Sequence, residues 1–498
     1  MASGLSVRQS GTLRPAHRET VFCKTLVVGN SVAAYTATLA ILQAGGQVCW
    51  AQAGTLDLVA TLNRQQRSQQ AESRFSWRQG RRISPWEEAT VMSQSQQTFW
   101  TNWQPQSTLA ASKTPPQLPP SGKSSAVAAA PRKNKDSQFR RAIAPYLQNQ
   151  QLILIPRGLP IRVLYSQQRG KRRVHQVVFQ DATTRQRFQI HARLILDATA
   201  DALLQKDLAE ASEATLIPEH RLTVDEAIAD LRREARGRVF PDSIAIVMAS
   251  GLDKRSKPRP LSVPLRSLIL QETEGFLNVS MPGCEPRLRP IFAHPRAQWA
   301  LGEAAGQIAA KAAQVGSIDA LRTAPNWSWS LQQTLVRQGI PVFAFDDVTL
   351  KDPDFEAIQM VAIADVVRTA RRRDLSFRPE TPVTKAVLAS ALTRLPKQTP
   401  PSSSDAAPLA DVTANHWAEQ AIQTAIANHT LTPEQATTFE PSKVLTQRQL
   451  WQVVQPLYPL HITTPPFGLS DAPARRRHLS RSLYPILQSQ LGNSQLGN

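Results

Sequence analysis

The sequence predicts an α/β protein followed by an all-α module. Three observations predict this fold class. Apolar, β-branched runs flank a small-residue helix pattern in residues 21–52, short strand patterns fill residues 139–201, and helix pairs separated by Pro-containing turns follow residue 339. Because one domain usually needs roughly 150 residues, a chain of 498 residues is expected to form two to four compact units.

The first of these segments has the order strand, helix, strand. VFCKTLVVG is apolar and β-branched, SVAAYTATLAILQAG has the small residues of a tightly packed helix, and GQVCWAQ is a second strand. This βαβ unit predicts a Rossmann-like domain, whose first turn is where a dinucleotide would bind.

That turn matches the fingerprint G-x-G-x-x-G/A only in part. Gly29 and Ala34 occupy the first and last positions, whereas Ser31 replaces the middle glycine. Gln52 ends the second strand, where an Asp or Glu would accept hydrogen bonds from a ribose. Taken alone, the turn leaves two interpretations open, a dinucleotide site and a βαβ unit that binds nothing.

Three later blocks extend the match. ARLILDATADALL (192–204) resembles the Asp-Ala-Thr-Gly turn of the FAD-dependent oxidoreductases, with Ala200 in place of the glycine. LSVPLRSLI (261–269) is similar to a strand of that family, and LGEAAGQIAAKAA (301–313) is similar to its final small-residue helix. The resemblance covers residues 21–342 in the correct order. It implies a Rossmann-like FAD/NAD(P)-binding domain with an inserted β-rich substrate region.

The resemblance also implies FAD as the cofactor and an unidentified small molecule as the substrate. The final helix would direct its N-terminus toward the flavin. No catalytic acid or base follows from the sequence, and His294, just before that helix, is a weak candidate. The expected cofactor-binding residues are Gly29, Ser31, Ala34, Gln52, Asp197, Ala198, Thr199, Gly302, Glu303 and Ala304.

The C-terminal part contains a duplicated pattern. Residues 345–395 and 408–454 each resemble an S-layer homology repeat, with an Asp-Val start, a helix, a Phe-x-Pro element and a second helix. Thr384 and Thr446 are predicted to cap the second helices, Asp411 to cap the turn before the first helix, and Trp417 and Ile422 to face the core. This module, 343–458, is a candidate docking site for a protein or a cell-wall polymer.

The remaining segments are predicted to be loosely ordered. Residues 1–20 form a basic tail, residues 104–135 a Pro- and Ser-rich disordered insertion, residues 396–407 a linker, and residues 459–498 a second basic tail. The N-terminal tail also fits a transit peptide but lacks the apolar stretch of a secretory signal. The cytoplasm is therefore the expected location, with an envelope association through the repeats left open.

Composition narrows the functional classes. A net charge of +20 attracts anions, but the Arg runs at 371–373 and 475–477 lack interleaved aromatics, so no specific nucleic-acid site is indicated. No apolar run reaches about 18 residues, which predicts a soluble protein without a transmembrane segment. Cys23, Cys49 and Cys284 show neither CxxC spacing nor nearby His ligands, so reduced, mostly buried thiols and no metal site are expected.

Two functions outside the enzyme class remain alternatives to an FAD-binding oxidoreductase. The departures at Ser31, Gln52 and Ala200 suggest a cofactor-free pseudoenzyme that acts as a scaffold, and the C-terminal repeats suggest an envelope-associated binding protein.

Overall fold

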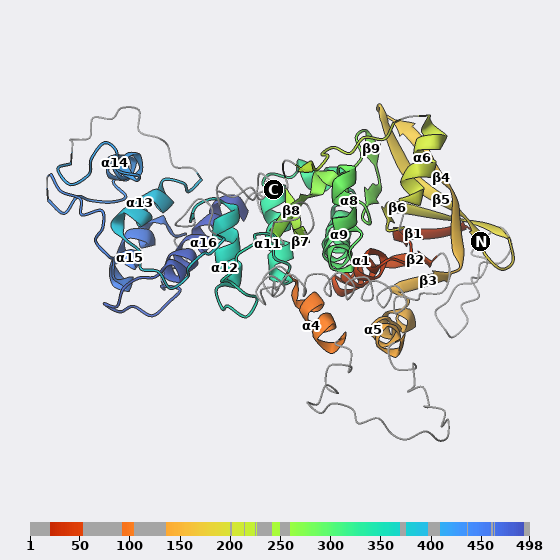
Figure 1. Ribbon diagram of the computed structural model, residues 1–498, viewed down its shortest axis with the longest axis horizontal. Helices are drawn as coiled ribbons and strands as arrows, with labels where there is room; N and C mark the ends of the chain where they lie inside the picture. Colours follow the sequence, from red (N-terminus) through yellow and green to blue (C-terminus); the bar gives the residue numbers. More distant parts are fainter. Residues whose placement is uncertain are drawn as a thin grey trace, which may run out of the picture.

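The computed structural model describes residues 20–52, 92–103, 136–199, 202–213, 215–224, 226, 242–249, 259–368, 375–396, 409–435, 437–459, 462 and 464–492. The molecule is elongated, with a β-sheet at one end and a helical module at the other (Figure 1). The predicted N-terminal tail apart from Thr20, the insertion at 104–135, and the linker apart from Pro396 lie outside the described residues, as does Ala200.

The sheet has the parallel core expected for a Rossmann-like fold. Strand β1 (Thr20–Val28) lies between β2 (Val48–Gln52) and β6 (Arg187–Asp197), and the order β3-β2-β1-β6 is parallel throughout. Side chains alternate between two cores, because Leu26 and Val28 face one side of the sheet and Val27 the other. The α/β fold class inferred from the sequence is confirmed at this level.

A β-rich extension joins the parallel core at β6. Strands β4 (Gly158–Gln168) and β5 (Lys171–Asp181) form an antiparallel hairpin, and β5 pairs with the first half of β6. The second half of β6 pairs with the short β10 (Phe276–Asn278) in parallel. The other elements of this part are β3 (Leu152–Pro156), β7 (Ser243–Ala249), β8 (Arg259–Pro264), β9 (Thr273–Glu274), α4 (Gln94–Trp103), α5 (Asp136–Gln148), α6 (Leu203–Ser212), α8 (Arg289–Phe292), α10 (Ile318–Thr323) and α11 (Trp327–Arg337).

Two parallel helices cover the Val27 face of the sheet, α1 (Val32–Gln43) and α9 (Pro295–Val315). Glycines on α9 let the two backbones approach closely. A Cβ at Gly302 would lie 2.3 Å from the Ala33 carbonyl oxygen, and one at Gly306 would lie 2.4 Å from that of Ala37. The small-residue pattern of α9 therefore serves this helix contact along its length.

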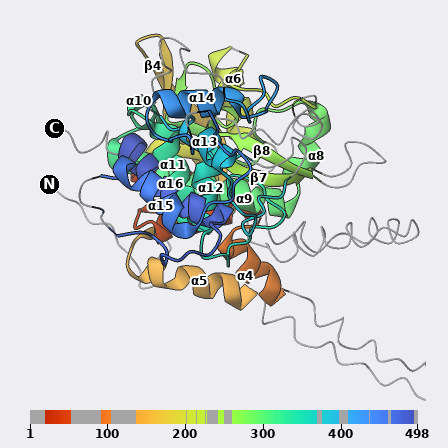
Figure 2. The same ribbon diagram turned by 90° about the vertical axis from the view of Figure 1, so that its left-hand side faces the viewer.

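The C-terminal module is built around a closed ring of three backbone hydrogen bonds. Val383 N donates to Ala474 O (2.8 Å), Leu445 N to Val383 O (2.9 Å), and Ala474 N to Leu445 O (2.7 Å). Each of these residues lies two positions before a helix, so three helices start at the ring; Figure 2 shows them on the same side of the molecule. They are α13 (Lys385–Leu392), α15 (Gln447–Val454) and α16 (Arg476–Gly492).

Helix α16 corrects the sequence-based interpretation of residues 459–498 as a loose tail. Its apolar positions Leu479, Leu483, Ile486 and Leu487 are fully buried, and α12 (Phe355–Ile363) packs against it. The sequence did not reveal this helix because basic residues surround its apolar positions.

The two segments 345–395 and 408–454 show equivalent contacts. Asp347 accepts hydrogen bonds from the backbone of Phe377 and Arg378, and Asp411 accepts the same pair from Phe439 and Glu440. Asp411 thus ties the two halves of its repeat together, instead of capping the turn before α14 (Glu419–Ala427).

Some of the helix caps and core residues predicted for the C-terminal module are found in the structure. The predicted caps Thr384 and Thr446 are confirmed, and Ile422 is fully buried. Trp417 was expected in the core, but its side chain is 66% exposed.

The hydrophobic core continues across residue 342, where the sequence predicted a domain boundary. One apolar cluster runs from Val27 on the sheet through α9 and α11 to Leu487 on α16. At the junction, Gln359 accepts from the backbone N–H groups of Val342 and Phe343 and donates to the Phe343 carbonyl oxygen. The helical module is therefore packed directly onto the α/β part.

Two further sequence-based expectations concern cysteines and membranes. Cys23 and Cys49 form a disulfide, with 6.1 Å between their Cα atoms, so the expectation of reduced thiols is wrong for this pair; Cys284 is free and buried. The pairing was missed because β1 and β2 bring positions 26 residues apart together. None of the described helices is long and apolar enough to cross a membrane.

Candidate functional site

The candidate site lies at the carboxyl ends of β1 and β6. The chain leaves β1 toward β2 on one side of the sheet, whereas β6 lies on the other side, so the strand order changes direction between β1 and β6. Ligands of open α/β sheets bind outside the carboxyl ends of the strands at such a point. The segments that follow β2, β6 and β7 lie partly outside the described residues.

Gly29 forms the turn from β1 into α1. Its φ of +136° is strained for any residue with a side chain. A Cβ here would lie 2.2 Å from the carbonyl oxygen of Ala198, in the turn after β6. Gly29 is therefore required for the contact between the two turns, a role that does not depend on a cofactor.

Ser31 caps α1. Its Oγ accepts a hydrogen bond from Ala34 N (3.1 Å) and donates one to Ala198 O (2.6 Å). The hydroxyl hydrogen is already used, so Ser31 could donate to a pyrophosphate only by giving up the Ala198 contact. Ser31, which replaces the middle glycine of the fingerprint, thus links the Gly29 turn to the Asp197 turn through its side chain.

Asp197 organises the turn after β6. Its carboxylate is completely buried and accepts hydrogen bonds from Thr199 N (3.1 Å), Thr199 Oγ1 (2.6 Å) and Gln205 N (3.1 Å). Its carbonyl oxygen accepts from Val279 N (2.9 Å), which follows β10. Burial raises the pKa of Asp197, and the hydrogen bonds to Thr199 counteract that effect. The side chain fixes the turn that Gly29 contacts.

The end of β2 contributes the expected Gln52 and an unexpected aromatic residue. Gln52 is buried at the carboxyl edge, one residue after Ala51, whose carbonyl oxygen accepts from Gly29 N (3.0 Å). Trp50 is fully buried and donates its indole N–H to Gly29 O (2.9 Å). Sequence reasoning missed Trp50, although a large aromatic two residues before the ribose position is a signal it could have used.

Helix α9 contributes the remaining expected residues, Gly302, Glu303 and Ala304, but these lie well inside the helix. All three are buried, and residues 295–301 of α9 precede them. Gly302 faces Ala33 and Thr36 of α1. The structure therefore does not place this GEAAG sequence at the helix N-terminus, where the resemblance implied it.

Glu303 is the most unusual polar residue near the site. Its Oε1 accepts from the Ser95 hydroxyl of α4 (2.6 Å), whereas Oε2 is buried and finds no hydrogen-bond partner among the described residues. Burial raises the pKa of this carboxyl group. Ser95 also accepts the indole N–H of Trp299 (3.1 Å), so α4 and α9 are joined through one hydroxyl.

His294, the weak catalytic candidate, caps α9. Its Nδ1 accepts the N–H of Arg296 (3.3 Å), which leaves the ring proton on Nε2. Burial and the neighbouring Arg296 lower the pKa of His294 to about 4. The imidazole is therefore neutral at pH 7, which fits a structural cap better than a proton donor. Within the described ranges, no cluster of His, Cys, Asp and Glu could hold a metal ion.

The structure thus brings Gly29, Ser31, Ala34 and the turn Asp197–Thr199 into direct contact, with Gln52 on the adjoining strand end. His294 begins α9. These positions meet because β1, β2 and β6 run parallel and end at the same edge of the sheet.

Comparison with known proteins adds little to this geometry. No protein-family model matches the chain, and no curated protein is similar to it in sequence. Among solved structures, THI4 of Thermovibrio ammonificans is 12% identical, with a TM-score of 0.28, over 58% of this chain and 89% of that protein.

Two further solved structures are similar at the same low level. A geranylgeranyl bacteriochlorophyll reductase-like protein of Thermoplasma acidophilum is 10% identical, with a TM-score of 0.29, over 69% and 92% of the two chains. A flavoprotein/dehydrogenase of Cytophaga hutchinsonii is 10% identical, with a TM-score of 0.26, over 69% and 93%. At these TM-scores the similarities support no functional assignment, which therefore depends on the geometry of the site.

Proposed function

We propose that the protein is an FAD-binding oxidoreductase that acts on an unidentified small substrate at the carboxyl edge of its sheet. One observation supports this proposal most directly. At the point where the strand order changes direction, the N-terminus of the twelve-residue helix α1, the Gly29 turn and the Asp197 turn meet. A helix N-terminus offers backbone N–H groups and a partial positive charge to a phosphate.

The residues fit FAD at the level of the backbone. The first turn of α1 would hold the pyrophosphate, and the Gln52 amide, which can donate and accept, would bind ribose hydroxyls without the charge of a carboxylate. Trp50 would hold the Gly29 turn in place, since its indole already binds the Gly29 carbonyl oxygen. Bound FAD would supply two-electron transfer.

The first experiment is an absorbance spectrum of the purified protein before and after incubation with FAD and desalting. Retained flavin is the expected result. Gln52→Ala should then weaken FAD binding roughly tenfold, because one or two hydrogen bonds of about 1 kcal/mol are lost. Gln176→Ala is the matched control, since Gln176 is equally buried but lies on β5, away from the site.

Folded protein that takes up no FAD would contradict the proposal. The cofactor-free scaffold would then be favoured, and one observation already fits it: Ser31 and Ala198 satisfy each other without a ligand. The Ser31→Gly variant further distinguishes an FAD-binding oxidoreductase from a cofactor-free scaffold. It should raise the FAD affinity of a cofactor-binding protein, whereas a scaffold would lose only the helix cap.

For the C-terminal module we propose a docking role toward a protein or a cell-wall polymer. The observation that favours it is Trp417, a 66% exposed indole beside the His416 ring at 5.8 Å. Exposed aromatic side chains of this kind are common in binding sites. Trp417→Ala should abolish retention on purified cell wall or on a captured protein partner. Wild-type protein that stays entirely in the supernatant of a cell-wall sedimentation assay would exclude the polymer.

A further inference from the structure

A wide groove lies near the amino ends of β1, β2 and β3, away from the candidate cofactor site at the carboxyl ends of these strands. It has a volume of about 770 Å³ and is lined by residues from all six strands β1 to β6. Volumes of this size are typical of small-molecule sites. Along β1, Cys23 and Gly29 are six residues apart, or about 20 Å in an extended strand, so the groove is separate from the cofactor edge.

The Cys23–Cys49 disulfide forms part of the groove wall. Its two sulfur-bearing residues differ in exposure, because Cys23 is partly exposed whereas Cys49 is 1% exposed. A nucleophile entering the groove would therefore reach the sulfur of Cys23, and Cys49 would be the leaving group. The third cysteine, Cys284, is buried elsewhere.

The groove is strongly basic. Its lining includes Lys24, Arg173 and Arg193 but no Asp or Glu. Among the residues that the structure describes, none of these three cations has a carboxylate partner, whereas neighbouring Lys171 pairs with both Asp319 and Glu274. Unpaired cations of one sign in a concave site raise the local concentration of anions.

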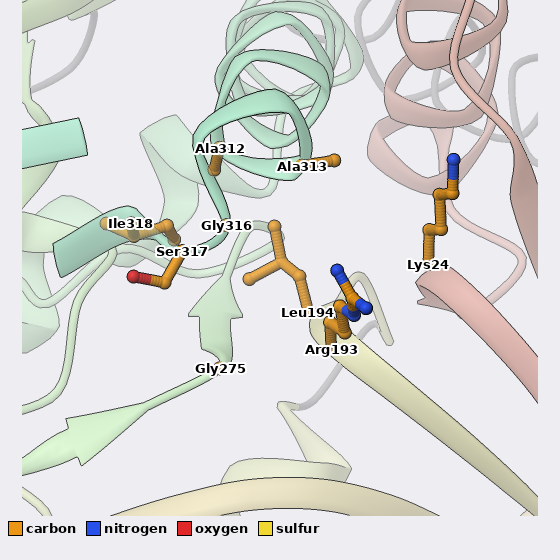
Figure 3. Close-up of a pocket in the computed structure, with 9 residues that line it drawn as sticks. All are labelled: Lys24, Arg193, Leu194, Gly275, Ala312, Ala313, Gly316, Ser317 and Ile318. Carbon is orange, nitrogen blue, oxygen red and sulfur yellow. The ribbon is translucent and has the colours of Figure 1, made fainter. Parts of the chain in front are cut away.

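Two of the cations also line a smaller adjoining cavity of about 20 Å³, next to the end of α9. Figure 3 shows the side chains of Lys24 and Arg193 extending from neighbouring strands into this region. Since helix C-termini carry partial negative charge, the end of α9 can orient these two cations. The guanidinium of Arg173, on β5, donates to Gln168 Oε1 at 3.4 Å and has no other hydrogen bond among the described residues.

We propose that this groove binds a small anionic thiol and that the thiol exchanges with the Cys23–Cys49 disulfide. The basic lining would concentrate the anion and stabilise both the attacking and the leaving thiolate. The inference does not depend on FAD binding, because the thiol itself is the reductant.

The exchange has two balanced steps. The ligand thiolate attacks Cys23 Sγ, the Cys23–Cys49 bond breaks, and Cys49 leaves as a thiolate that takes up a proton from solvent. A second ligand thiolate attacks the ligand sulfur of the mixed disulfide, which releases the oxidised ligand disulfide and the Cys23 thiolate, which is also protonated. Two thiols are thereby oxidised, and the protein disulfide is reduced to two thiols.

The test uses the full-length protein in a Cys284→Ser background and three probes: glutathione, which is anionic, 2-mercaptoethanol, which is neutral, and cysteamine, which is cationic. Rates are compared per thiolate, and products are located by peptide mass spectrometry. Glutathione is expected to react at least tenfold faster than cysteamine, with a rate that falls as salt is added. The first adduct is expected on Cys23.

Two groove variants, Lys24→Gln and Arg193→Gln, should slow glutathione several-fold and should slow 2-mercaptoethanol less, because only glutathione carries carboxylates in addition to the attacking thiolate. Arg448→Gln is the matched control, because this exposed arginine lies in the C-terminal module. Equal rates for the anionic and cationic thiols, or equal effects of groove and control variants, would overturn the proposal.

A Cys49→Ser variant tests the same site without the disulfide. Its Cys23 thiol should form a mixed disulfide with oxidised glutathione faster than with cystamine. No adduct on Cys23, while circular dichroism shows folded protein, would also exclude the proposal.

Discussion

The α1–α9 contact and the C-terminal ring solve the same problem, the close approach of backbones, by different means. In the first, two helices touch because side chains are absent at Gly302 and Gly306. In the second, three segments meet because Val383, Leu445 and Ala474 satisfy one another in a closed circle of hydrogen bonds. The first contact should therefore fail when volume is added, and the second when a polar partner is removed.

The largest loss of stability is expected at the buried ion pairs between Asp354 and two arginines of α16. Asp354 is 2% exposed in its side chain and accepts from Arg477 Nη1 (2.8 Å) and Arg481 Nη2 (3.0 Å) of α16. Asp354→Ala should lower the free energy of unfolding by about 3 kcal/mol, because Arg481 loses the one carboxylate it pairs with among the described residues, and Arg477 keeps only Asp352 and Glu380. Urea denaturation measures this loss.

A surface pair provides the control for that prediction. Asp471 pairs with Arg448 but is 80% exposed, so Asp471→Ala should cost less than about 0.5 kcal/mol. Equal losses in the two variants would mean that burial does not decide the strength of these pairs.

The next effect tests the glycine contact of the α/β part. Gly302→Ala places a methyl group 2.2 Å from Thr36 Oγ1 and 2.3 Å from Ala33 O, so the helices must separate. We expect a loss of about 2 kcal/mol in urea or thermal unfolding. Gly468→Ala is the matched control and should be neutral, since no atom lies within 4 Å of its Cβ position. An unchanged midpoint for Gly302→Ala would disprove the close contact.

A smaller effect concerns the N-terminus of α9 and depends on pH. The pKa of His294 is about 4 in the folded protein against an ordinary value of 6.5, so the unfolded chain binds more protons between these values. The contribution of His294 is fully present above pH 6.5 and is lost as the pH falls toward 4. The full shift corresponds to roughly 3 kcal/mol, which we discount to about 1–2 kcal/mol because the residue is only partly buried. His294→Asn keeps a capping acceptor and should flatten this part of the pH–stability curve.

The smallest effect concerns a single cap of the ring. Thr446 accepts from Gln449 N (3.1 Å), and the Gln449 side chain accepts from Thr446 N (2.9 Å), which completes a capping box. Thr446→Ala should cost about 1 kcal/mol. Thr424→Ala, in the exposed middle of α14, should cost close to nothing. A larger loss of stability for Thr446→Ala than for Gly302→Ala would contradict the order expected for these two variants.

The sequence predicted the parts of the fold that depend on local pattern. The βαβ unit, the β-rich extension and the caps at Thr384 and Thr446 follow from periodicity and from residue types at helix starts, and the structure contains them. It also selected Gly29 and the Asp197 turn as partners in one site. Each of these signals lies within a few residues of the element that it specifies.

Other features required the tertiary structure. Sequence spacing did not reveal that Cys23 reaches Cys49, that Trp50 binds the Gly29 carbonyl oxygen, or that Ser31 uses its hydroxyl on Ala198. It did not show that Gly302 lies against Ala33 of α1, and it assigned the third helix of the ring to a loose tail.

The physical reason is the same in each case. Local sequence determines which residues can form a strand, a helix or a cap, because those preferences act between near neighbours along the chain. The partner of a glycine, a cysteine or a buried hydroxyl is chosen by the packing of distant segments. For this protein the sequence alone determined the βαβ unit, the β-rich extension and two helix caps, and it indicated the carboxyl edge of the sheet as the candidate cofactor site. Only the tertiary structure decided which side chains at that edge are already satisfied and which groove remains open at the other.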